Sequence, residues 1–110
     1  MNISLEEAIG LLEGWRKAGT EVRLHVSTQK GSREVRAVIT SLTGTKVGIV
    51  ADTEILTLDL KGGEFNGDRR SSPITNQGPY LVCEFRNDDR WSFRAPQAPS
   101  SVQKERRRID

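Results

Sequence analysis

The chain has 110 residues, which is enough for one domain with its own hydrophobic core and too few for two. Hydrophobic residues make up 35% of it, and no apolar run approaches the roughly 20 residues needed to span a bilayer, so we expect no contact with a membrane. Residues 97–110 carry the whole net charge of +2, and residues 1–96 are formally neutral. Because nucleic-acid-binding domains usually carry positive charge on the folded body, this balance disfavours nucleic acid as a partner.

The N-terminal segment predicts a helix between Ser4 and Gly19. Ser4 and Glu7 have the spacing of a capping box, in which each side chain satisfies a free backbone N–H at the helix start. Gly19 is a natural left-handed residue at the helix end. The apolar residues repeat at helical spacing and predict one buried stripe, made of Leu5, Ala8, Ile9, Leu12 and Trp15. Met1 is followed by polar and acidic residues, so we expect no secretory signal and a cytoplasmic location.

After Thr20 the apolar period changes from 3.6 to 2, which is typical of strands with one wet face. Short turns separate the alternating segments and predict successive antiparallel hairpins. The predicted strands cover residues 22–27, 35–42, 46–51, 54–60, 80–86 and 90–94. Residues 61–79 are rich in Gly, Asp and Ser and are predicted to form a long irregular loop.

These elements predict a mainly β domain over residues 1–96, in which the N-terminal helix caps a small antiparallel barrel of five to six strands. Closing the barrel removes exposed strand edges. The alternative is a strongly bent sheet with the helix across its concave face. Residues 97–110 contain Pro, Ser and charged residues and are predicted to be a disordered basic tail.

The order of a capped helix and a bent five-stranded meander resembles the Sm-like small barrels, whose SH3-like folds form RNA-binding rings. The resemblance covers residues 4–60 and 80–94. Aligned on the strands, Ala37, Thr43 and Val47 stand where that family has the glycine, aspartate and asparagine of its RNA-base site, so the base-binding groups are missing. The chain is also similar to a family of uncharacterised bacterial proteins, through its first helix and the segment LDLKGGEF at residues 58–65. That similarity implies no activity.

A third resemblance concerns the PilZ domains, which bind cyclic di-GMP on a small barrel. The segment that begins at Asp59 resembles their D-x-S-x-x-G element, with Lys61 in place of the serine. Arg33 and Arg36 stand for their arginine pair, although they are three residues apart instead of four. Arginine pairs suit phosphate because guanidinium groups donate bidentate hydrogen bonds. The resemblance makes Arg33, Arg36 and Asp59 candidate residues for nucleotide or anion binding.

Trp91 and Phe93 share one face of the last strand. They are expected to pack beneath the helix, and the functional alternative is an exposed edge platform for a partner. Cys83 is expected in the core and His25 on a wet strand face. The tail residues that could contact phosphates or an acidic partner are Lys104, Arg106, Arg107 and Arg108. No phosphate-loop, nucleophile-elbow or zinc motif is present, so we expect no enzyme activity, metal or cofactor.

The leading functional hypothesis is therefore a non-enzymatic protein-interaction module that forms homo-oligomers through strand edges. The first alternative is an Sm-like nucleic-acid-binding protein in which oligomeric symmetry concentrates weak basic patches. The second alternative is a PilZ-like barrel that binds a cyclic dinucleotide.

Overall fold

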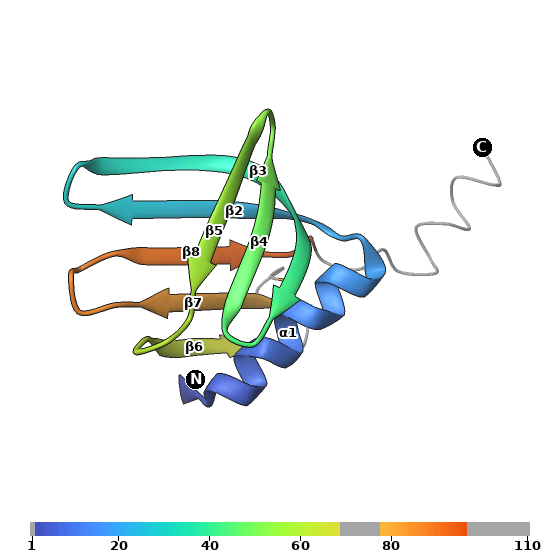
Figure 1. Ribbon diagram of the computed structural model, residues 1–110, viewed down its shortest axis with the longest axis horizontal. Helices are drawn as coiled ribbons and strands as arrows, with labels where there is room; N and C mark the ends of the chain where they lie inside the picture. The colour runs from blue at the N-terminus through green and yellow to red at the C-terminus, as the bar shows by residue number, and fades with distance from the viewer. Residues whose placement is uncertain (1, 69–77, 97–110) are drawn as a thin grey trace, which may run out of the picture.

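The computed structural model describes residues 2–68 and 78–96, which form one helix and one antiparallel sheet of eight strands (Figure 1). The strand order is β1-β6-β7-β8-β2-β3-β4-β5. The helix is α1 (Leu5–Ala18), and the strands are β1 (Asn2–Ile3), β2 (Glu21–Thr28), β3 (Gly31–Thr43), β4 (Lys46–Ala51), β5 (Glu54–Asp59), β6 (Glu64–Asp68), β7 (Tyr80–Glu84) and β8 (Arg90–Arg94).

The helix forms where the sequence predicts it, and both of its ends have the predicted caps. The Glu7 backbone N–H donates to Ser4 Oγ at 3.1 Å, and the Ser4 backbone N–H donates to Glu7 Oε1 at 3.3 Å. Gly19 adopts the left-handed conformation with φ of 64° and ends the helix. The buried side of α1 consists of Ala8, Leu11, Leu12 and Trp15, and it packs against β3 and β6.

The six predicted strands are confirmed as β2 to β5, β7 and β8, but the prediction of a five- to six-stranded barrel is wrong. The sheet has two additional strands and is open, because β1 and β5 at its two ends each pair with only one strand among the described residues. The strand β6 lies inside the predicted loop, at residues 64–68, and pairs with β7. The sequence shows no apolar alternation here, because the second inward position of this strand is Gly67 and carries no apolar side chain. The two residues of β1 are too few to show any period.

The sheet bends back on itself along β3. This strand has 13 residues, and its pairing with β4 shifts register between Ile39 and Ser41, as at a β-bulge. Gly48 lies at this point, where an added Cβ would come within 2.2 Å of Ser41 Oγ. In Figure 1, β4 and β5 cross over β2, β8 and β7 at a steep angle. The arrangement is that of the bent sheet, the alternative to a closed barrel.

One apolar core fills the space between the two halves of the bent sheet and the helix. The buried side chains come from both halves, among them Leu24, Leu81 and Phe93 from one and Ile49 and Leu58 from the other. No polar or charged residue is buried among the described residues. Within residues 2–68 and 78–96, no helix has the length and apolar character needed to cross a membrane.

Candidate functional site

Two of the sequence-predicted binding residues, Arg33 and Arg36, lie on opposite faces of β3, because three positions separate them. Arg33 is on the core-side face of β3 but is exposed, and its Nη1 and Nη2 donate to Glu54 Oε1 and Oε2 at 2.9 and 2.7 Å. This bidentate pair keeps the pKa of the Glu54 carboxyl below its ordinary value. Arg36 faces outward, with its Nε 4.0 Å from Glu21 Oε1. The two arginines therefore do not face a common ligand site.

Asp59, the third predicted residue, lies at the other end of the β4–β5 hairpin. It pairs with Lys46, whereas the residue after Arg36, Ala37, pairs with Ala51 at the opposite end of β4. The Asp59 carboxylate accepts hydrogen bonds from the Lys61 backbone N–H at 3.0 Å and from Thr45 Oγ1 at 2.8 Å. These hydrogen bonds, that of Lys61 first, lower the pKa of Asp59. The structure does not bring Asp59 together with the two arginines.

Trp91 and Phe93 both point to the inner face of β8, as their spacing predicts. Phe93 is fully buried, and its ring centroid lies 6.4 Å from that of Trp15. Trp91 is half-buried against the same core. Because β8 lies between β7 and β2, neither aromatic residue is at a sheet edge. The tail candidates Lys104, Arg106, Arg107 and Arg108 lie outside the described residues.

Cys83 is fully buried in β7, and burial raises the pKa of its thiol to about 12. Since the thiolate is the reactive form, iodoacetamide should alkylate Cys83 about a thousandfold more slowly in the native protein than an ordinary exposed thiol. Mass spectrometry of native and urea-unfolded samples, labelled at the same mildly alkaline pH, measures this protection. Equal labelling rates in the two samples would contradict the prediction.

An apolar strip on the outer face of the sheet ends at its free edge. Val38 on β3 pairs with Val50 on β4, and Val50 pairs with Ile55 on β5. Val50 is 37% exposed and Ile55 is 81% exposed, and they are the exposed large apolar residues of the described chain. We call Val38, Val50 and Ile55 the edge strip. The sequence predicts that Ile55 faces outward, because the alternation of Leu56, Leu58 and Leu60 toward the core leaves Ile55 on the opposite face.

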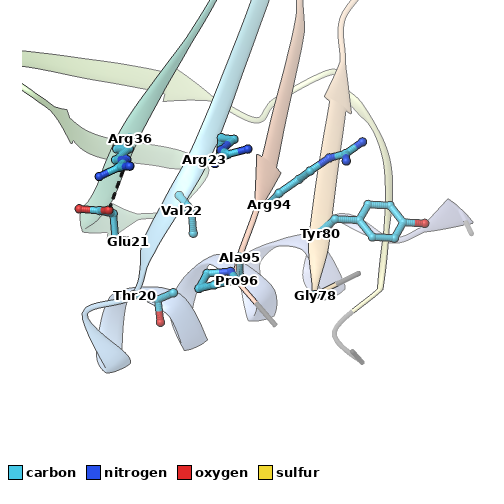
Figure 2. A pocket seen from close by; sticks show the side chains of 10 residues that line it. All are labelled: Thr20, Glu21, Val22, Arg23, Arg36, Gly78, Tyr80, Arg94, Ala95 and Pro96. Atoms are coloured by element: carbon cyan, nitrogen blue, oxygen red, sulfur yellow. Dashed lines mark ion pairs between the residues drawn. The ribbon is translucent and has the colours of Figure 1, made fainter. Parts of the chain in front are cut away.

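A line of arginines crosses the outer face on the other side of the bend (Figure 2). Arg36 on β3 pairs with Arg23 on β2, Arg23 pairs with Arg94 on β8, and Arg94 pairs with Tyr80 on β7. We call Arg36, Arg23 and Arg94 the arginine row. It borders a groove of about 980 Å³ that Tyr80 and Pro96 also line. Alternation predicts that each arginine faces water, and the β2–β3 hairpin places Arg36 beside Arg23, but only the pairing of β2 with the distant strand β8 places Arg94 beside Arg23.

His25 lies exposed on the outer face of β2, as predicted, with Glu34 and Ser92 as its neighbours on β3 and β8. In the part of the chain that the structure describes, no group of three His, Cys, Asp or Glu residues is placed to hold a metal ion.

Comparison of the chain with family models, curated proteins and solved structures finds no match. The resemblances to the Sm-like, PilZ-like and bacterial families therefore stay predictions.

Proposed function

We propose that this domain is a protein-interaction module that self-associates by pairing β5 with β5 of a second copy. The observation that supports the proposal is the edge strip. Isolated apolar residues on a protein surface are ordinary. Here, however, Val50 and Ile55 are directly paired, and Ile55 belongs to β5, whose outer edge pairs with no other described strand. Such an edge presents unpaired backbone N–H and C=O groups to another chain.

The charges of β5 favour particular registers for two-fold antiparallel pairing. A register centred between Leu56 and Thr57 would place Glu54 opposite Asp59 of the second copy, and like charges directly opposite each other destabilise a strand pair. A register centred on Leu56 instead places Glu54 opposite Leu58 and Ile55 opposite Thr57. This register separates the acidic side chains and covers Ile55 with a residue of the second copy, as an isologous interface requires.

The substitution Ile55→Asp tests this proposal, because it places a charge at the centre of the interface. We expect the wild-type chain to form dimers between micromolar and millimolar concentration, and Ile55→Asp to weaken dimerisation at least about thirtyfold, as for the loss of an interface hot spot. Sedimentation equilibrium over this concentration range measures the effect.

The matched control is Ser32→Asp, which adds the same charge at an exposed position of β3 far from the edge strip. It should leave the dimerisation constant unchanged. A wild-type chain that stays monomeric at millimolar concentration, or an Ile55→Asp variant that dimerises like the wild type, would refute self-association through β5.

A further inference from the structure

The arginine row places positive side chains next to one another on three adjacent strands. Neighbouring strands are about 4.8 Å apart, and like charges directly opposite each other destabilise a sheet. All three arginines are exposed, so the core does not require them. A row of this kind is favourable when a negatively charged ligand lies over it.

The acidic residues among residues 2–68 and 78–96 neutralise this row only in part. Arg23 Nε lies 3.3 Å from Glu34 Oε1, and Arg36 Nε lies 4.0 Å from Glu21 Oε1. Both pairs are exposed to solvent, where ion pairs contribute little. Arg94 has no ion pair or side-chain hydrogen bond with the other described residues. The donors of its guanidinium group are therefore available to a ligand.

The surface around the row is hollowed on both sides. The groove of about 980 Å³ lies on one side, and a smaller groove of about 370 Å³ lies on the other. Arg23 and Arg94 line both grooves. In Figure 2 the Arg94 side chain extends across β7 toward the side where Tyr80 lies, and it points away from Arg23 on β2. The larger groove has the volume of sites that bind small organic molecules.

We infer that Arg94 binds the phosphate group of a nucleotide, with Arg23 and Arg36 adding positive charge and Tyr80 contacting the base. A guanidinium group matches phosphate geometry because it can donate two parallel hydrogen bonds, and the Arg94 guanidinium lies on the side of the groove where Tyr80 lies. Tyr80, opposite Arg94 at the end of the row, offers a ring on which a base can stack. The ligand is either a free nucleotide or one unit of a single strand.

Titration of the full-length protein with inorganic phosphate, a mononucleotide and a short oligothymidine, followed by NMR of backbone and arginine Nε–H signals, tests this site. We expect the signals of Arg23 and Arg94 to shift with each probe. The substitution Arg94→Gln should weaken binding about ten- to a hundredfold, as for the loss of hydrogen bonds to a charged group. Arg94→Lys keeps the charge and loses the bidentate geometry, so its affinity should lie between those of the wild type and Arg94→Gln.

The control Arg86→Gln removes a positive charge at an exposed position in the β7–β8 turn, outside both grooves, and should bind like the wild type. If the mononucleotide binds more tightly than inorganic phosphate, and Tyr80→Leu removes this difference in affinity, the result supports a free nucleotide as the ligand. If only the oligothymidine binds more tightly than inorganic phosphate, the result supports a single strand as the ligand. The proposal is overturned if no probe shifts the arginine signals at about 10 mM, or if Arg86→Gln weakens binding as much as Arg94→Gln.

A stability measurement separates ligand binding from a structural role of Arg94. Without ligand and at low salt, Arg94→Gln relieves repulsion within the row, so the midpoint of thermal unfolding should rise by about 1–4 °C. A fall of that size would show that Arg94 stabilises the fold and would overturn its assignment to a ligand site. Both measurements are repeated in the Ile55→Asp background, in which pairing through β5 is weakened, so the site is tested independently of β5 pairing.

Discussion

Replacement of Phe93 with alanine is expected to lower the free energy of unfolding by about 3–5 kcal/mol, the range for removing a large aromatic side chain from a packed core. Phe93 is fully buried and packs against Trp15 of α1 at a ring-centroid distance of 6.4 Å. In the sheet it pairs with Leu24 on β2 and with Leu81 on β7, and both are fully buried. Its removal would leave a cavity between the helix and these two strands.

Urea unfolding followed by circular dichroism measures this loss. The matched control is Ile55→Ala, which also truncates an apolar side chain but at a position that is 81% exposed, and it should change the monomer's stability by less than about 0.5 kcal/mol. The experiment also decides between the two interpretations of Phe93 made from the sequence. A Phe93→Ala variant as stable as the wild type would be inconsistent with its place in the core.

The substitution Gly67→Ala is expected to destabilise the protein by about 1–3 kcal/mol, as does the insertion of a methyl group into a packed core. An added Cβ would lie 2.7 Å from the Tyr80 carbonyl oxygen and 3.3 Å from the Cδ1 atoms of Ile3 and Leu11. The carbonyl belongs to the β6–β7 pairing and cannot rotate away as a flexible side chain would. Glycine at this position therefore lets β1, β6 and α1 approach one another closely.

Gly14→Ala is the matched control, because it makes the same chemical change where nothing lies within 4 Å of the added Cβ. In the middle of a helix this change should stabilise the protein by about 1 kcal/mol. The two alanine variants should therefore shift the urea midpoint in opposite directions. Stabilisation by both would mean that β6 can move away from Tyr80.

The local elements could be predicted from the sequence because their signals lie within a few residues. The capping box of Ser4 and Glu7 and the alternation of Val22, Leu24 and Val26 each fix an element without reference to the rest of the chain. The strand β6 was missed because Asn66, Gly67 and Asp68 have low strand propensity, and its pairing with β7 outweighs that propensity.

Neither the open sheet nor the pairing of Arg23 with Arg94 in the arginine row could be predicted from the sequence, for a different physical reason. Alternation assigns a side chain to a face of its own strand, but it does not say which strand lies beside it. Arg23 and Arg94 become neighbours only because β2 pairs with β8, which comes from the far end of the domain. The same uncertainty led to the expectation of a closed barrel, since alternation is alike in a barrel and in a bent open sheet.

The bend at β3 also determines how the two proposed surfaces combine. With the core between its halves, the sheet turns the outer face of β4 and β5 away from the outer face of β2 and β8. Two copies joined at β5 would therefore leave both arginine rows accessible. A single strand of nucleic acid long enough to reach both rows would bind bivalently, because its second contact forms at the high effective concentration that the first contact creates. The affinity for a mononucleotide would not change on dimerisation, because a mononucleotide contacts only one arginine row.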